Sequence, residues 1–159
     1  MKKKLTTFIT TKVCGGKMPM VTDGEYYYYN DGHKLFRTKE KLLPIPAEKS
    51  FAITSWFKDI DATRYDLPDA EEINDNIKEL CGRKLDNVGV KFSEETPILN
   101  ARWVRDAMKA LNTKGMYYIP QKGKISPVYM FENDDLQSEN ILMILPINNH
   151  QNVGYKIYA

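Results

Sequence analysis

The chain contains few of the residues on which metal, redox and histidine-based chemistry depend. Its 159 residues include only two cysteines, Cys14 and Cys81, and two histidines, His33 and His150. The spacing of the cysteines matches no zinc or redox motif, which favours a reduced, cytoplasmic protein. No apolar run approaches the roughly 20 residues that a membrane-spanning helix requires, so we expect no membrane partner.

Neither histidine is accompanied by the residues that would make it catalytic. His33 follows a glycine turn and His150 lies in a polar segment, and no serine, cysteine or carboxylate motif belongs to either. Phosphate-binding, dinucleotide-binding and zinc motifs are also missing. Asp134, Asp135 and Glu139 lack the glycine-containing pattern of a calcium loop and predict a solvated loop. We therefore expect a protein that is not an enzyme and uses no metal or cofactor.

Charge of either sign is not in large excess. The formal net charge of +2 at pH 7 is too small to indicate a nucleic-acid-binding protein, so only a local cluster of basic residues would do so. A hydrophobic content of 42% and a charged content of 28% are ordinary for a globular protein. We expect residues 1–159 to form a single domain with a substantial core.

The most regular pattern is an amphipathic helix over residues 101–111. Asn100 is suited to the N-cap, where its side-chain oxygen accepts from an unpaired backbone N–H. At about 100° per residue, one face is apolar and the opposite face is mainly basic. The apolar face holds Val104, Ala107, Met108 and Leu111, and the polar face holds Arg102, Arg105, Asp106 and Lys109. Lys114 supplies a cation near the C-terminal end, and Gly115 is predicted to form the left-handed cap.

Three short strands are predicted after this helix, over residues 116–119, 125–131 and 140–147. They are rich in Ile, Val, Tyr and Phe, and turn formers at 121–124 and 133–135 separate them. The sequence therefore predicts an α+β fold in which an antiparallel sheet carries one or two helices on one face.

The first strands are predicted from aromatic residues and a turn. Tyrosines fill positions 26–29, and strand alternation sends two of them to each face. A base-stacking role is the alternative, but strand packing is favoured. Asp31 and Gly32 then predict a hairpin turn, because glycine adopts a positive φ without strain.

The middle of the chain predicts one strand and one acidic helix. Residues 51–60 are predicted to be a strand, with Trp56 and Phe57 in the core. Residues 68–80 are predicted to be a helix, with an early proline and apolar residues Ile73, Ile77 and Leu80 on one face. Gly82 would cap it. One added terminal strand is expected over residues 155–158.

Two stretches resemble the bacterial DNA sliding clamp, the beta subunit of DNA polymerase III. Residues 99–111 (L-N-A-R-W-V-R-D-A-M-K-A-L) are similar to the family's F-N-A-R-Y-L-L-D-A-L-K-A-L, and I-S-P-V at 125–128 and L-P-I at 145–147 also match. Residues 29–36 (Y-N-D-G-H-K-L-F) resemble the family's A-T-D-G-H-R-L-A. The likeness is best over residues 99–148, a half-domain of the clamp. It implies a condensed, single-domain DNA-clamp-like protein of the kind found in phage and mobile elements.

The resemblance also implies a binding groove for hydrophobic tails of polymerases or repair factors. It assigns one side of the groove to Gly32, His33, Lys34 and Leu35, and the other to Met143, Leu145, Pro146 and Ile147. The chain departs from the family at Lys34, where the clamps have Arg, at Asn30, where they have Thr, and at Asn148, where Arg is common. The missing Arg changes the polar rim of the groove.

The clamps line a ring with basic helices, so the resemblance implies contact with double-stranded DNA. The residues it assigns to that contact are Arg102, Arg105, Lys109 and Lys114. The alternative is that a surface helix simply needs a polar face. Encircling DNA would require a homo-oligomer of this short chain.

Two functions follow from these expectations. The first is a non-enzymatic replication accessory that tethers a partner peptide on DNA. The second is a monomeric peptide-binding module, or modulator of replication proteins, that does not encircle DNA.

Overall fold

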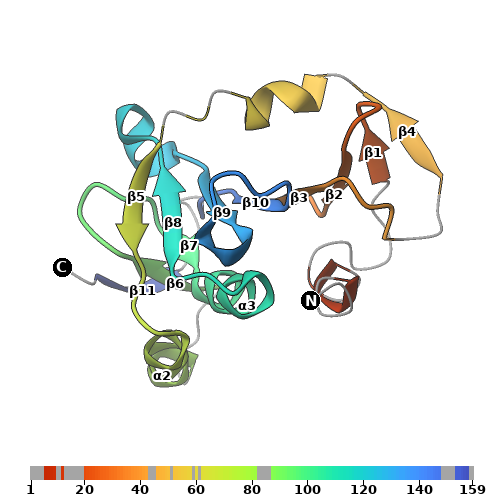
Figure 1. Cartoon of the computed structure of the whole chain (residues 1–159). Helices are drawn as coiled ribbons and strands as arrows, with labels where there is room; N and C mark the ends of the chain where they lie inside the picture. The colour runs from red at the N-terminus through yellow and green to blue at the C-terminus, as the bar shows by residue number, and fades with distance from the viewer. Residues whose placement is uncertain are drawn as a thin grey trace.

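A continuous sheet of eight strands forms the centre of the protein (Figure 1). The computed structural model describes residues 6–9, 12, 20–42, 46–50, 52–58, 60, 62–81, 87–147 and 153–157, excepting the side chains of 52–54, 80, 81, 87 and 153–157. The strand order is β4-β1-β2-β3-β10-β9-β8-β5. Only β1 and β4 are parallel neighbours in this sheet. The predicted α+β fold with a mainly antiparallel sheet is confirmed.

The strands of this sheet come from both halves of the chain. They are β1 (Met20–Thr22), β2 (Tyr27–Asn30), β3 (Lys34–Thr38), β4 (Ala47–Lys49), β5 (Thr63–Asp66), β8 (Gly115–Tyr118), β9 (Val128–Phe131) and β10 (Ile141–Ile144). A second, three-stranded sheet contains β6 (Asn87–Lys91), β7 (Leu99–Asn100) and β11 (Val153–Ile157). The predicted terminal strand is therefore present but begins earlier. It pairs in parallel with β6.

Both faces of the large sheet are covered. In Figure 1, α2 (Ala70–Cys81) and α3 (Ala101–Leu111) lie below the sheet, as predicted for one face, and the 3₁₀ helix η2 (Ala52–Phe57) lies above it. Strand β10 contributes side chains to the clusters on both faces, because side chains alternate across a strand. Leu142 and Ile144 join the core under α3, whereas Ile141 and Met143 join the aromatic cluster under η2.

The tyrosines of β2 follow the same alternation. Tyr29 is buried in the core on the helix side, and Tyr28 is buried on the η2 side. Tyr27 and Tyr26 pack against the same two clusters in turn. Strand packing is thus confirmed for these aromatic residues.

Helix α3 begins as predicted and ends differently. Asn100 Oδ1 accepts from the N–H groups of Arg102 and Trp103 at 3.1 and 3.3 Å. Asn112, with φ of 50°, is the left-handed C-cap, so the prediction of Gly115 was wrong. Asparagine tolerates this conformation, and the chain leaves the helix at once. Gly115 instead begins β8.

Two other predicted boundaries are corrected by 3₁₀ turns. Residues 51–60 were predicted to be a strand, but η2 occupies most of that range. Residues 120–125 form the 3₁₀ helix η3 (Pro120–Ile125), so β9 begins only at Val128. A third 3₁₀ turn, η4 (Glu132–Asp134), links β9 toward β10. The β8-β9-β10 meander itself is confirmed.

The acidic helix is confirmed as α2, beginning at Ala70 rather than Pro68. Ile73 and Ile77 are buried. Within the described ranges, no helix has the length and apolar character needed to cross a bilayer. Predictions that concern Cys14, the Cys81 and Leu80 side chains, Gly82, Asn148 and His150 lie outside the described residues.

Candidate functional site

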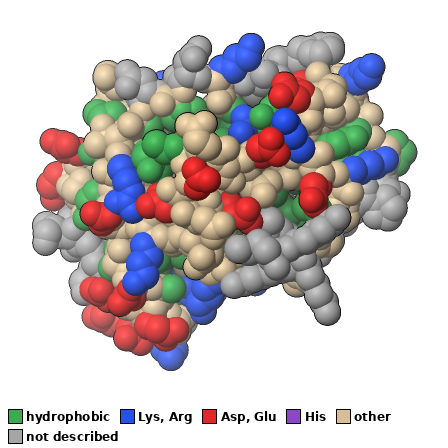
Figure 2. All heavy atoms as spheres, viewed as in Figure 1, with side chains coloured by type: hydrophobic (Ala, Val, Ile, Leu, Met, Phe, Trp, Pro, Cys, Tyr) green, Lys and Arg blue, Asp and Glu red, His purple; other side chains and the backbone are tan. Residues whose placement is uncertain are grey.

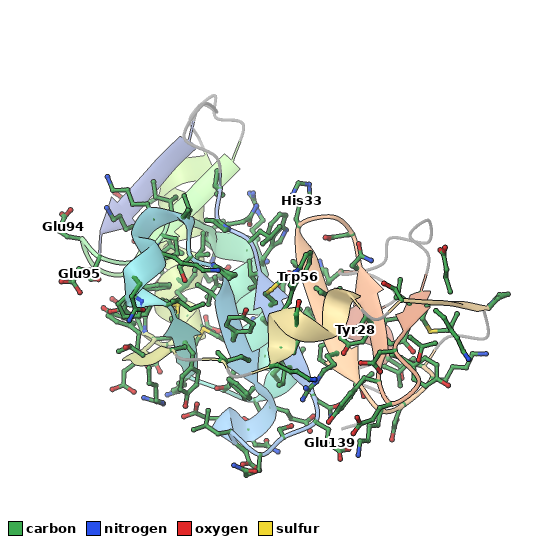
Figure 3. All side chains as sticks on the ribbon, turned by 90° about the horizontal axis from the view of Figure 1, so that it is seen from above. Tyr28, His33, Trp56, Glu94, Glu95 and Glu139 are labelled. Carbon is green, nitrogen blue, oxygen red and sulfur yellow. The ribbon has the colours of Figure 1, made fainter. Side chains whose placement is uncertain are left out.

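The turn between β2 and β3 is held by the side chain of Asp31. Its Oδ1 accepts hydrogen bonds from the backbone N–H groups of His33 and Lys34, both at 2.8 Å. Gly32 has φ of 89°, which glycine adopts without strain. The predicted hairpin is confirmed, with His33 at its tip (Figure 3).

Strand β10 pairs with β3, so the two predicted sides of the groove are direct neighbours. Leu35 lies opposite Met143 in the antiparallel register. The Leu145 N–H donates to the His33 carbonyl at 2.9 Å, which extends the pairing past the end of β10. The Ile147 N–H then donates to the Ile98 carbonyl at 2.8 Å. Leu145 is left 37% exposed at the point where β10 ends.

A cavity of about 190 Å³ lies at these strand ends, and we call it the small cavity. Its lining residues are Asn30, Gly32, His33, Lys34, Leu35, Trp56, Met143 and Leu145. Both predicted sides therefore contribute to one cavity. Pro146 and Ile147, which were predicted with them, are half-buried beside it rather than in its wall.

Trp56 belongs to this site, although it was predicted to lie in the core. It is 54% exposed, whereas its neighbour Phe57 is 6% exposed. Successive residues of a 3₁₀ helix point in well-separated directions, so Phe57 enters the aromatic cluster while Trp56 faces outward. The ring of Phe57 lies 5.6 Å from that of Tyr28 and 6.1 Å from that of Tyr129. Figure 3 shows Trp56 on η2 near the His33 end of the strands, far from Glu139.

A second cavity, of about 550 Å³, adjoins the first and is called the large cavity here. The two share Trp56, Met143 and Leu145. Tyr129 also lines the large cavity, and its hydroxyl donates to the Trp56 carbonyl at 2.8 Å. Burial raises the pKa of Tyr129, which keeps this donor protonated. The wall between the cavities is therefore tied to the central sheet.

Lys34 supports the hairpin from beneath. It is only 5% exposed, and its Nζ lies 2.9 Å from Asp31 Oδ2. The same atom lies 4.0 Å from the centre of the Trp103 ring. The His33 ring lies 5.5 Å from that ring. A buried ammonium needs such partners, because its desolvation is otherwise unfavourable.

The predicted DNA-contacting residues do not form one free basic surface. Arg102 and Lys109 are exposed. Arg105 donates to Asp106 Oδ1 at 3.2 Å and to Asn74 Oδ1 at 3.0 Å, and Lys114 Nζ lies 2.6 Å from Asp69 Oδ1.

Helix α2 packs beside α3 and adds acidic side chains to the same side of the molecule. Its exposed carboxylates include Glu71, Glu72 and Glu79. Figure 2 shows acidic side chains gathered over α2. The potential near α3 is therefore mixed in sign.

Among the described residues, no three His, Cys, Asp or Glu side chains gather in a way that would hold a metal ion. In the predicted acidic loop, Asp135 and Glu139 are exposed. Asp134 is instead bound by Arg64, whose Nε donates to its Oδ2 at 3.1 Å. The small cavity, by contrast, is formed by apolar side chains at a hairpin turn and at strand ends, which suits the binding of an apolar group.

Comparison with protein-family models and with curated proteins gives no significant match for this chain.

Proposed function

We propose that the chain is a non-enzymatic, clamp-like peptide-binding module that receives short hydrophobic tails of replication or repair proteins. The observation that supports this most directly is the small cavity. The small cavity is lined by residues near both ends of the chain, in the two segments that resemble the clamp's peptide groove.

The dimensions and chemistry of the small cavity suit side chains of a peptide. Leu35, Met143, Leu145 and Trp56 supply apolar walls. Its volume of about 190 Å³ is below the roughly 300–1,000 Å³ of pockets that enclose a whole drug-sized ligand. An exposed tryptophan side chain at a concave site is also a typical anchor of a protein interface.

The test is binding of fluorescent Gln-Leu-x-Leu-Phe-like peptides, followed by anisotropy. Leu145→Asp is expected to eliminate binding, because a carboxylate in an apolar contact costs several kcal/mol, about 3 or more. Leu136→Asp is the matched control, since Leu136 is also an exposed leucine but lies in the β9–β10 connection. Equal binding by wild type and Leu145→Asp would contradict the proposed groove.

A second proposal is that several copies assemble around DNA. The exposed Arg102 and Lys109 on α3 favour it, whereas the pairing of Arg105 and Lys114 with acidic partners favours the monomeric module. Light scattering over a concentration series, with and without double-stranded DNA, separates the two. A closed oligomer with salt-sensitive DNA retention, lost in Arg102→Glu/Lys109→Glu, would support assembly on DNA. A monomer at every concentration would exclude it.

A further inference from the structure

The large cavity is lined by basic side chains that the proposed function does not use. Lys58 and Lys122 both line it, together with the polar Ser55 and Gln121. No Asp or Glu is found among the described residues of its lining. A cavity with apolar walls and two ammonium groups has the chemistry to receive a carboxylate that is attached to an apolar chain.

Lysines in the described part of the chain fall into paired and unpaired groups. Lys34, Lys39 and Lys114 each lie within 4 Å of a carboxylate, at 2.9, 3.0 and 2.6 Å. Lys58 and Lys122 are exposed and form no ion pair with a described carboxylate. Within the described part of the chain, no carboxylate neutralises either ammonium group.

The position of these cations relative to the small cavity is fixed by shared walls. Trp56, Met143 and Leu145 separate the two cavities. Lys58 follows the η2 helix that carries Trp56, and Lys122 lies in η3. Because Tyr129 holds the Trp56 carbonyl, the tryptophan and the sheet form one unit. A single extended peptide that crosses this shared wall would reach both cavities.

We propose that the partner of this groove is an acidic peptide, with one or more Asp or Glu side chains bound at Lys58 and Lys122 beside the apolar anchor in the small cavity. This inference rests on the proposed function and adds the charge of the ligand to it. Opposite charges across an interface increase both specificity and the association rate.

The experiment compares peptides of identical apolar content. Each carries Leu-Phe with capped ends, and a pair of residues on the N-terminal or the C-terminal side is either Asp-Asp or Asn-Asn. We expect at least one Asp-Asp peptide to bind about fivefold to tenfold more tightly than its Asn-Asn twin at low salt, and the difference to shrink at high salt.

Variants assign this preference to the large cavity. Lys58→Gln/Lys122→Gln should remove the preference while leaving binding of the Asn-Asn peptides unchanged. Lys109→Gln is the matched control, because Lys109 is an exposed lysine on α3 and lies outside both groove cavities. It should retain the preference.

The outcomes separate the inference from the function beneath it. Equal binding of Asp-Asp and Asn-Asn peptides overturns the acidic partner and leaves the peptide groove intact. Failure of every peptide to bind overturns both. Sodium glutamate competing as strongly as the Asp-Asp peptide would mean a site for small anions, and that result also overturns the acidic peptide.

Discussion

The Nζ of Lys34 lies 4.0 Å from the centre of the Trp103 ring and is almost completely buried. This contact joins the hairpin turn to α3, which comes from a distant part of the sequence. Cation–π contacts of this kind contribute about 0.5–2 kcal/mol, more when water is excluded. The hairpin turn, whose residues line the small cavity, is therefore held in place by a contact with α3.

Replacement of Lys34 by Met should lower the free energy of unfolding by about 1–3 kcal/mol, because Asp31 and Trp103 both lose their cation. Urea denaturation measures this change. Lys34→Arg should cost less, since a guanidinium keeps the charge. A double-mutant cycle with Trp103→Leu should give a coupling near 1 kcal/mol, and a coupling of zero would show that the ring and the ammonium act independently.

Trp56 and Phe57 should respond in opposite ways to replacement by alanine. Phe57→Ala leaves a cavity in the aromatic cluster and should cost about 3 kcal/mol of stability. Trp56→Ala removes an exposed ring, so we expect little loss of stability but at least tenfold weaker peptide binding. Thermal denaturation and anisotropy measure the two effects. A large loss of stability in Trp56→Ala would assign that side chain to the core.

Gly115 is close to an ion pair, and Gly115→Ala should disturb it. An added Cβ would lie 2.5 Å from Asp134 Oδ1 and 2.8 Å from Arg64 Nη2. The hydrogen bonds from Arg64 to Asp134 and Asp66 raise the pKa of that guanidinium, so these groups hold one another in place.

We expect Gly115→Ala to lower stability by about 1 kcal/mol, as overpacked sites do. In an Arg64→Ala background the added methyl has more space, and its cost should fall. The comparison is made by chemical denaturation of all four proteins. An unchanged cost in that background would exclude the clash with Arg64 as the cause and leave the contact with Asp134.

Stability should fall at alkaline pH partly through Tyr129. Burial raises the pKa of its hydroxyl above the ordinary value of 10.0. The unfolded chain then loses this proton at lower pH than the folded protein. The stabilisation that comes from this difference in pKa is complete below pH 10, the ordinary pKa of tyrosine. It is lost as the pH rises through the higher pKa of the folded protein. Melting temperatures between pH 8 and 11 should decline less steeply in Tyr129→Phe than in wild type, and parallel curves would contradict this assignment.

Local sequence was sufficient for elements whose signals are contained within them. Asn100 and the apolar spacing from Val104 to Leu111 predicted the start and buried face of α3. The Asp31-Gly32 pair predicted the hairpin turn. In both cases the residues that determine the structure are neighbours along the chain.

Elements that depend on distant contacts were not predictable in this way. The range around Trp56 and Phe57 is rich in strand-forming residues, but the aromatic cluster that receives Phe57 contains Tyr28 and Tyr129 from other parts of the chain. A turn that places one ring inside and one outside leaves no periodic signal. The two sides of the groove were predicted from a family likeness, and the pairing of β3 with β10 that brings them together was not.

The pairing of β3 with β10 has a consequence for protein synthesis. Strand β3 has β2 on one side and β10 on the other, and β10 spans Ile141–Ile144. On the ribosome, β3 therefore emerges long before its second partner and presents an open edge that carries Leu35 and Phe36. Such edges are prone to join other chains, and pairing across so long a separation is slow. A translation product that stops before Ile141 would expose this edge and contain no groove.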